Sequence, residues 1–185
     1  MAVCMSKPGA LSLEKLVTVS LGWDKRTTSG IDFDLDASAI GCNCHGKALS
    51  DQYFVFYNNL RSPEGAIEHV GDNLSGTGTG DDEVIRIDLT KAPPKLVHIF
   101  LAVSIYDAAA REQKFINVRN AFVRLLKSDG TPFYRFDLSN NAPSTAAIVI
   151  GALDRQRNNV WNFREVRETY ATGLAGIARF YKVNV

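Results

Sequence analysis

The sequence lacks three features that mark special classes of protein: long hydrophobic runs, a dense set of cysteines and an excess of basic charge. Its most apolar stretch, LVHIFLAVSIY at residues 96–106, is interrupted by His98 and Ser104 and is shorter than the roughly 18 residues that indicate a membrane-spanning helix. The beginning, MAVCMSKPGALSLEK, has no apolar region of signal-peptide length. The three cysteines are an odd number, which fits a reducing compartment better than a disulfide framework. We therefore expect a cytoplasmic protein.

The charge balance argues against nucleic acid as a partner. The chain has 21 basic and 20 acidic residues and a formal net charge of +1, so bulk electrostatic attraction to nucleic acid is not expected. The two signs are separated, however, because acids gather in the first half and most arginines follow. Ordinary solvation would explain these arginines, and an acidic protein or an anionic membrane surface is the alternative. They are Arg111, Arg119, Arg124, Arg135, Arg155, Arg157, Arg164 and Arg167.

Most segments have strand patterns with turn residues between them. Strands are predicted at residues 15–23, 31–41, 52–59, 83–89 and 95–106, followed by two hairpins at residues 121–138 and 145–168. Short helices are predicted at residues 110–120 and 172–181. We expect one domain spanning residues 1–185, of which residues 1–11 form a loosely ordered segment. The predicted fold class is mainly β, an antiparallel β-sandwich of two packed sheets with a few short helices.

One predicted strand has an unusual acidic pattern, IDFDLDASA at residues 31–39. Asp32, Asp34 and Asp36 alternate with apolar residues, which is typical of a half-buried strand. Residues two apart lie on one face of a strand, about 6.5 Å from each other. The apolar set would therefore face a core, and the three carboxylates would face outward together. Like charges in a row repel one another unless a cation lies among them.

A second acidic segment, GDNLSGTGTGDDE at residues 71–83, combines four glycines with four acids and Asn73. Glycine permits the tight loop conformations that surround a small ligand. Carboxylates, amide oxygens and backbone carbonyls are the hard ligands that Ca²⁺ prefers, whereas Mg²⁺ requires a stricter octahedron. The two acidic segments together therefore indicate a cation site, with calcium favoured.

Other interpretations of these two segments were less consistent with the residues. An EF-hand needs glycine at loop position 6 and glutamate at position 12, where the chain has Ala37 and Asn43. A phosphate-binding loop needs a Lys-Ser/Thr pair and a following helix, and the carboxylates beside GTGTGDDE would repel phosphate. The simplest alternative is a solvated strand face beside a flexible loop, with no ligand.

These segments, together with others along the chain, resemble the TerD family of bacterial tellurite-resistance and general stress proteins. The resemblance rests on GWD at residues 22–24, DFDLDASA at 32–39, FVFYNN at 54–59 and GDN followed by GDDE within 71–83, and on VSIYDA, FINVRNAFVRL, YRFDL and VWNFREV farther along. It covers residues 13–181, and the order of the motifs is more specific than any one of them. It implies a β-sandwich that binds Ca²⁺ through its acidic loops and has no established enzymatic activity.

The resemblance also implies a set of metal ligands, made of carboxylates, one amide and backbone carbonyls. They are Asp32, Asp34, Asp36, Asp72, Asn73, Gly76, Gly78, Asp81, Asp82 and Glu83. This chain has Thr77 and Thr79 between loop glycines where the family usually has acidic residues. We therefore expect weaker binding, or one ion where relatives hold two.

In function, the resemblance implies a calcium-binding stress-response protein whose Ca²⁺-loaded acidic face acts as a binding or sensing surface. Its expected partners are other proteins of a stress-resistance system. We expect no catalytic residues and no cofactor besides Ca²⁺. The alternative is a metal-dependent, hydrolase-like enzyme that uses the same carboxylates to position a metal-bound water. That alternative requires a pocket beside the acidic face.

Two further candidates carry less support. CNCH at residues 42–45 contains Cys42 and Cys44, but a structural zinc site needs four ligands, usually from two spaced pairs, and the sequence offers no second pair. Exposed thiolates at these positions could instead react with tellurite or other oxidants. His98 lies within an apolar run and is predicted to be a hydrogen-bonded core residue.

Overall fold

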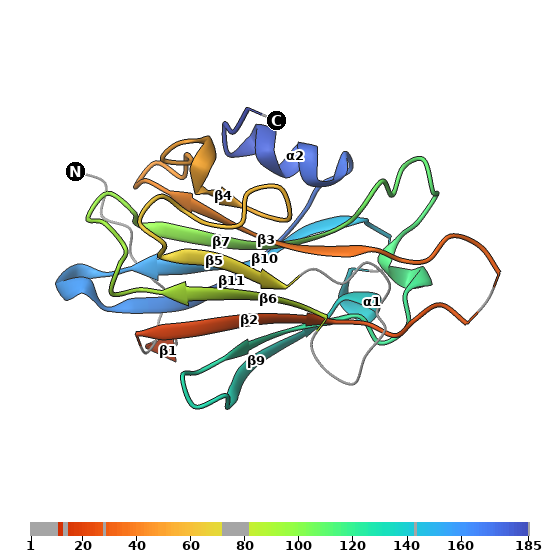
Figure 1. The fold of residues 1–185 in the computed structure, drawn as a ribbon, viewed down its shortest axis with the longest axis horizontal. Coiled ribbons are helices and arrows are strands. Elements are labelled where there is room, and N and C mark those ends of the chain that lie inside the picture. The colour runs from red at the N-terminus through yellow and green to blue at the C-terminus, as the bar shows by residue number, and fades with distance from the viewer. Residues whose placement is uncertain (1–10, 13–14, 28, 72–81, 143, 185) are drawn as a thin grey trace.

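The computed structural model describes residues 11–12, 15–27, 29–71, 82–142 and 144–184, whose strands form two antiparallel sheets (Figure 1). One sheet has the order β1-β11-β10-β7-β3-β4 and the other the order β5-β6-β2-β8-β9. The strands are β1 (Leu11–Ser12), β2 (Leu16–Gly22), β3 (Leu35–Cys42), β4 (Phe54–Val55), β5 (Ile67–Gly71), β6 (Glu83–Asp88), β7 (His98–Ile105), β8 (Phe122–Leu126), β9 (Pro132–Asp137), β10 (Ala147–Arg155) and β11 (Trp161–Thr169). The helices are α1 (Leu138–Asn141), α2 (Gly173–Phe180) and the 3-10 turns η1 (Asp51–Tyr53), η2 (Phe115–Asn117) and η3 (Arg157–Asn159). The predicted sandwich of two packed antiparallel sheets is confirmed.

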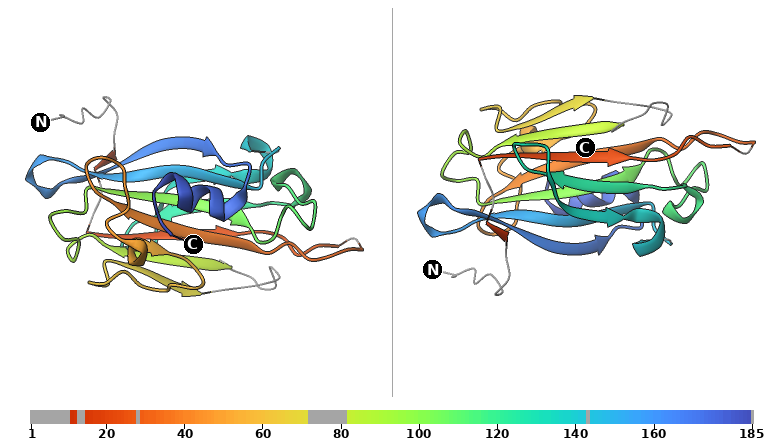
Figure 2. Two further views of the ribbon diagram at one scale, coloured as in Figure 1. Left: turned by 90° about the horizontal axis from the view of Figure 1, so that it is seen from above. Right: turned by 90° about the horizontal axis from the view of Figure 1, so that it is seen from below.

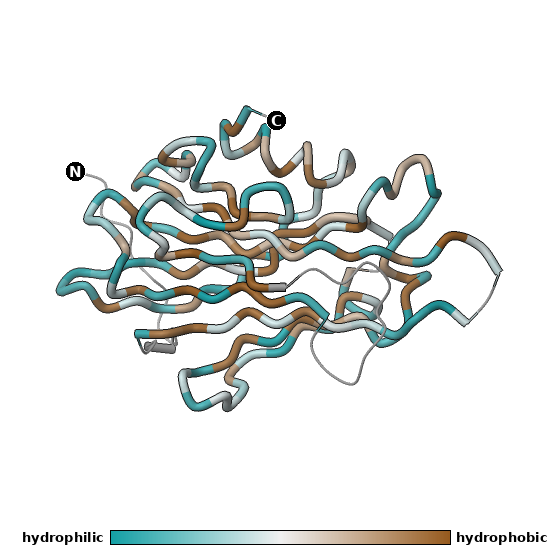
Figure 3. The backbone as a smooth tube through the Cα atoms, viewed as in Figure 1, coloured by the Kyte–Doolittle hydropathy of each residue, from teal (hydrophilic) through white to brown (hydrophobic). Residues whose placement is uncertain are grey.

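The hydrophobic core lies between the two sheets, where every second residue of the central strands points inward. Val17, Val19 and Leu21 of β2 are buried there, and Leu101 and Val103 of β7 meet them from the other sheet. Figure 3 shows hydrophobic residues concentrated along the strands and polar residues in most connections. The period of two in the sequence therefore identifies which side of each strand forms the core.

A second apolar cluster covers part of the outer face of the six-stranded sheet. Ile177 and Ala178 of α2, with Tyr181 directly after it, pack onto Cys42 of β3 and Ala102 of β7. Figure 2 shows α2 lying across this face. The helix predicted from the spacing of apolar residues near the C-terminus is confirmed.

The two predicted hairpins are confirmed, each with residues that favour left-handed backbone in its turn. Gly130, between β8 and β9, has a φ of +80°. Asn158 and Asn159, between β10 and β11, have φ of +68° and +59°. Glycine and asparagine adopt this conformation at low cost, which explains why these positions reverse the chain.

Two predictions from the sequence pattern are wrong. Residues 52–59 are not one strand, because Phe56 and Asn59 pair across a tight turn and the Asn59 side-chain amide donates to the carbonyls of Gln52 and Phe54 at 3.0 and 2.7 Å. Residues 110–120 are not a helix but turns around η2. Glu112 has a φ of +51° there, which a right-handed helix does not contain.

The edge strand β5 and the short helix α1 have no clear pattern in the sequence. The strongly apolar residues of β5, Ile67 and Val70, are three apart and do not alternate with period two. The pairing of β5 with β6 also shifts register between His69 and Gly71. An irregular edge strand of this kind is stabilised by its neighbour rather than by its own pattern.

Within the described residues, no helix is long and apolar enough to cross a membrane. The segment expected to be loosely ordered, residues 1–11, lies outside the described residues except for Leu11. Leu11 begins β1 and pairs with Phe163 of β11.

Candidate functional site

The acidic segment at residues 31–39 faces the way its alternation predicts from Phe33 onward, but the predicted strand begins at Leu35 rather than Ile31, and Ile31 is 59% exposed. The apolar residues that point into the core are Phe33, Leu35 and Ala37. Asp32 is exposed, Asp34 is half-buried and Asp36 is only 3% exposed, although all three belong to the opposite, outward set. Asp36 is therefore covered by something other than the core.

The backbone of this acidic segment docks on the loop that follows β7. Tyr106 donates its backbone N–H to the carbonyl of Asp34 at 2.8 Å. The Gln113 side-chain amide donates to the carbonyls of Ile31 and Asp32 at 3.1 and 3.3 Å. These bonds replace strand pairing before β3 begins at Leu35, and they fix the carboxylates relative to the loop.

Glu83, the first residue of β6, joins the two sheets at the same end of the sandwich. Its side chain points inward, is 0% exposed and accepts a hydrogen bond from the backbone N–H of Ala37 in β3. His69 of β5 lies beside it, with Nε2 3.6 Å from Oε2 of Glu83. Because a buried carboxylate is costly without partners, these contacts hold Glu83 in place between the sheets.

Asp82 fixes the beginning of β6 against the end of β2. Its carboxylate accepts a hydrogen bond from the backbone N–H of Trp23 at 3.0 Å, and its own N–H donates to the carbonyl of Leu21 at 2.8 Å. The Trp23 indole N–H in turn donates to the carbonyl of Phe33 at 3.2 Å. The end of the glycine-rich segment is thereby linked to the beginning of the acidic strand.

Four of the predicted ligands lie at one end of the sandwich, Asp34 and Asp36 in the outward set of the acidic segment and Asp82 and Glu83 at the beginning of β6 between the sheets, and we call this region the acidic end. Five others lie outside the described residues: Asp72, Asn73, Gly76, Gly78 and Asp81. Among the residues that the structure does describe, no group of three or more His, Cys, Asp or Glu side chains is arranged to hold a metal ion. The predicted calcium site therefore depends on the glycine-rich segment and stays a prediction.

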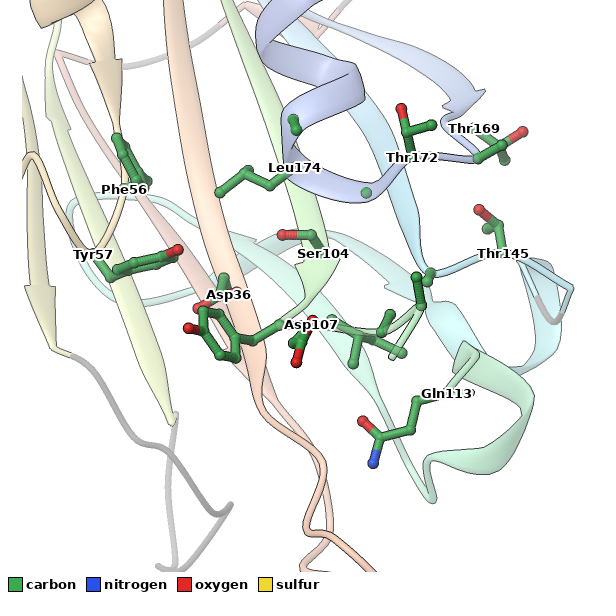
Figure 4. A pocket seen from close by; sticks show the side chains of 18 of the residues that line it. Asp36, Phe56, Tyr57, Ser104, Asp107, Gln113, Thr145, Thr169, Thr172 and Leu174 are labelled. Carbon is green, nitrogen blue, oxygen red and sulfur yellow. The ribbon is translucent and has the colours of Figure 1, made fainter. Parts of the chain in front are cut away.

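Asp36 forms part of the floor of a groove on the outer face of the six-stranded sheet, beside the acidic end (Figure 4). The groove has a volume of about 1690 Å³. Its walls are the turn after β4, the loop at residues 106–114, the segment at 144–146 and the beginning of α2. Side chains that line it include Phe56, Tyr57, Ser104, Asp107, Gln113, Thr172 and Leu174.

Sequence reasoning did not find this groove. Of its acidic loop residues, Glu112 lies in the segment at residues 110–120 whose pattern predicts a helix, and Asp107 lies just before that segment. Both have positive φ, at +49° and +51°, which aspartate adopts more readily than glutamate. The polar residues of the loop that follows the apolar strand β7, among them Asp107 and Glu112, were the signal that the sequence offered.

His98 is confirmed as a hydrogen-bonded, buried residue at the other end of the sheet. Its Nδ1 lies 2.7 Å from Oδ1 of Asp154, and the Arg164 guanidinium donates to Oδ2 of Asp154 at 2.6 Å. Burial alone would raise the pKa of Asp154, but the hydrogen bonds from His98 and Arg164 outweigh it and lower this pKa below its ordinary range. This network links β7, β10 and β11 and lies away from the groove.

The geometry of the cysteines weakens both the zinc and the thiol hypotheses. Cys42 is buried under α2, and burial raises the pKa of its thiol to about 12, so it is not a thiolate at neutral pH. Cys44 is exposed in the turn that follows. The two side chains therefore belong to different environments, and only Cys44 is accessible to a reagent.

Most of the arginines in the second half contact groups of this chain. Arg124 and Arg135 stack on Phe122, with guanidinium carbons 5.3 and 4.0 Å from the ring centroid. Others lie over Tyr106, Trp161 and Phe136 or bind Asp154 and Glu165. These side chains are tied to the sandwich surface rather than gathered in one basic patch.

Comparison with known proteins agrees with this architecture. A family model described as the TerD domain matches residues 1–181. The chain is 44% identical over 191 residues to Tellurium resistance protein TerD of Serratia marcescens, with 100% of this chain and 99% of that protein covered. It is 40% identical over 171 residues to General stress protein 16U of Bacillus subtilis (strain 168), covering 91% and 88%. The crystal structure of a homologue of telluride resistance protein (TerD) from Streptomyces coelicolor A3(2) matches with a TM-score of 0.76 at 22% identity, covering 87% of this chain and 93% of that one.

Proposed function

Because this chain belongs to the TerD family of tellurium-resistance and stress-response proteins, we propose that it binds Ca²⁺ at its acidic end. In this proposal the chain is a binding or sensing module rather than an enzyme. The calcium-loaded acidic end is the surface through which it acts in the stress response.

The hydrogen bond between Glu83 and Ala37 is the observation that carries the proposal. It places the beginning of β6, where the glycine-rich segment ends, against the inner side of β3, the strand whose outer side carries Asp36. Glu83 and Ala37 are far apart in the sequence, and this contact brings the beginnings of β3 and β6 to one end of the sandwich (Figure 1). Asp34 and Asp36 are like charges on one side of the acidic segment, and a divalent cation would offset the repulsion between them.

The chemistry of the donors fits a hard cation. The acidic end offers carboxylate oxygens, and its one nitrogen ligand candidate, His69, already lies 3.6 Å from Glu83. A calcium shell takes about six to eight oxygens, and the described acidic side chains are not arranged to supply such a shell by themselves. We therefore assign the rest of the shell to residues 72–81, whose acids, amide and glycine carbonyls are the right donor types.

The proposed roles differ along the chain. Asp36 in β3 and Asp34 just before it belong to the outward set, and Asp32 lies at the exposed rim. Asp82 and Glu83 each give one oxygen to a backbone N–H, so they hold the end of the glycine-rich segment in position. When bound, Ca²⁺ would neutralise these carboxylates and cross-link the two acidic segments.

The proposed partners are proteins of a stress-resistance system that bind the neutralised acidic end. An anionic membrane surface is the other proposed partner, with Ca²⁺ between carboxylates and lipid phosphates. Sedimentation with phosphatidylserine vesicles, with and without Ca²⁺, separates the two: calcium-dependent co-sedimentation supports the membrane, and its absence leaves the protein partner.

Calorimetric titration of Ca²⁺ into chelator-treated protein tests the calcium site. We expect saturable binding that excess Mg²⁺ does not displace, and a stoichiometry that decides between one ion and two. Binding should also stabilise the fold, by about 2.7 kcal/mol when free Ca²⁺ is 100 times its Kd. The double variant Asp34→Asn/Asp36→Asn should bind at least about tenfold more weakly, since two charged ligands are lost.

A matched control removes two charges elsewhere. Asp88, at the end of β6, and Asp129, in the β8–β9 turn, lie at the opposite end of the five-stranded sheet from Glu83, so Asp88→Asn/Asp129→Asn should leave the calcium Kd unchanged. The absence of heat at millimolar Ca²⁺, with no change in Tm, would contradict the proposal. If calcium affinity falls equally in both double variants, the binding depends on overall charge and not on a site at the acidic end.

A metal-dependent hydrolase is the second candidate, favoured by one observation: a groove lies beside the acidic end, with Asp36 on its floor. Against it, none of the described residues that line the groove is a histidine that could serve as a general base. Release of nitrophenol from phosphate and carboxylate esters in the presence of Ca²⁺ or Mn²⁺, lost in Asp36→Asn, would establish this candidate.

A further inference from the structure

We infer that the groove beside α2 binds an extended peptide segment carrying a lysine or arginine side chain. Its volume of about 1690 Å³ exceeds the roughly 300–1,000 Å³ of a small-molecule pocket and is far more than a metal ion needs. The inference goes beyond the calcium proposal and does not require a bound metal.

The floor of the groove contains a buried hydroxyl that has no partner. Ser104 of β7 lies directly opposite Asp36 of β3, and the two are 1% and 3% exposed. The Ser104 hydroxyl points into the space between Tyr57 and Leu174 (Figure 4). Within the described part of the chain it makes no hydrogen bond. A ligand group that pairs with it would remove the cost of an unsatisfied buried polar atom.

A second buried polar group lines the end of the groove near the loop at residues 106–114. Gln113 is 5% exposed and uses its side-chain N–H groups on the carbonyls of Ile31 and Asp32. Its side-chain carbonyl oxygen has no partner among the described residues. An unpaired carbonyl can only accept a hydrogen bond, so this position selects for a ligand that donates.

The charge of the lining selects for a cation. The acidic lining residues are Asp36, Asp51, Asp107 and Glu112, and the one basic residue among the described lining is Lys114. Asp107 and Glu112 form no ion pair with any other described residue. Carboxylates at the rim of a partly enclosed groove attract cations more strongly than the same groups on an open surface.

Aromatic rings on the rim of the groove can also contact a guanidinium or an ammonium group. Tyr57 and Tyr106 approach edge to face, with ring centroids 5.9 Å apart. The guanidinium of Arg111 from this chain already lies 5.1 Å from the centroid of Tyr106, so the rim accepts a cation in the structure itself. Phe56 and Leu174 add apolar surface for the aliphatic part of a long basic side chain.

The spacing of these features favours a peptide over a small free amine. Acceptors are present on the floor at Ser104, at the loop end at Gln113, and on the rim at Asp107 and Glu112. One lysine or arginine side chain satisfies only one of these positions, whereas the N–H groups of an extended backbone reach several. A free polyamine has the same charge without backbone donors, and it is the alternative that the experiment must separate.

Fluorescence anisotropy with the labelled peptide Gly-Ala-Lys-Ala-Arg-Ala-Gly, in EDTA at low salt, tests this inference. We expect saturable binding that weakens as salt is added, because exposed carboxylates contribute. The Asp107→Asn/Glu112→Gln variant should raise the Kd by about tenfold, and Ser104→Ala by about fivefold. Because EDTA is present, failure here leaves the calcium proposal untouched, and failure of calcium binding leaves this one untouched.

Three controls define the outcome. The variant Glu68→Gln/Asp129→Asn removes the same charge outside the groove and should change the Kd less than about twofold. The same peptide with glutamate in place of lysine and arginine should not bind. Spermidine should compete only weakly. Equal binding of the glutamate peptide, an unchanged Kd in Asp107→Asn/Glu112→Gln, or spermidine binding as tightly as the peptide would each overturn the inference.

Discussion

The outer face of the six-stranded sheet has two halves built from the same strands but with opposite chemistry. The covered half presents Ile40, Cys42 and Ala102 to α2, and the open half presents Asp36 and Ser104 to the groove. Both halves belong to the outward set of β3 and β7, so alternation alone does not distinguish them. The half that α2 covers has apolar residues, and the half that lies under the groove has polar ones.

The length of α2 explains where the boundary falls. An eight-residue helix is about 12 Å long, whereas the eight residues of β3 extend over about 26 Å. The helix begins at Gly173, whose φ of +64° turns the chain at the edge of the groove. Residues under α2 therefore serve stability, and residues beyond it remain available for ligands.

The largest expected effect comes from weakening the packing of α2, which covers the apolar half of this face. Tyr181 is 1% exposed and packs on Phe100 with ring centroids 4.6 Å apart, so Tyr181→Ala should lower the free energy of unfolding by about 3–5 kcal/mol. Urea denaturation measures this. Phe180→Ala is the matched control, since Phe180 is 58% exposed and should cost about 1 kcal/mol or less. Equal losses in the two variants would show that α2 does not act as a cover.

The next effect concerns the link between the sheets. Glu83→Ala removes the acceptor for the Ala37 N–H and the neighbour of His69, and we expect a loss of about 2–4 kcal/mol in urea denaturation without Ca²⁺. Glu68→Ala on the neighbouring edge strand should cost about 1 kcal/mol or less. If Glu83→Ala is as stable as this control, the two acidic segments are not held together by Glu83.

The network under the far end of the sheet should show its own pH dependence. The pKa of Asp154 is lowered in the folded state, so its contribution is complete above the ordinary carboxyl range, near pH 4, and is lost as the pH falls through the lowered value. Asp154→Asn should cost about 2 kcal/mol at pH 7 and flatten the acid side of a plot of Tm against pH. Asp137→Asn, at an exposed pair with Arg135, should leave that plot unchanged.

The smallest effect tests the open half directly. Ser104→Ala should change the free energy of unfolding by less than about 0.5 kcal/mol, because its hydroxyl makes no hydrogen bond in the described structure. Ser62→Ala should cost about 1–2 kcal/mol, since the buried Ser62 hydroxyl accepts from the Ile67 N–H at 3.0 Å. A loss at Ser104 as large as that at Ser62 would mean that the floor of the groove is structural.

Alternation in the sequence was enough to predict the faces of β3 and the positions of both hairpins, because these depend on local period and turn residues. The burial of Asp36 was not predictable, since the walls that cover it come from three loops and a helix far along the chain. The contact between Glu83 and Ala37 spans 46 positions, and no local pattern encodes it. Residues 110–120 have an amphipathic pattern, yet docking of Gln113 on the acidic segment selects turns instead.

The central claim is that ligands act on the open half of this sheet and leave the covered half unchanged. Amide chemical shifts recorded by heteronuclear NMR during a Ca²⁺ titration test it directly. The account predicts shifts at residues 34–37 and 82–84, with residues 40–42 and 177–181 unchanged. Shifts confined to the covered half, or none at all at millimolar Ca²⁺, would contradict it.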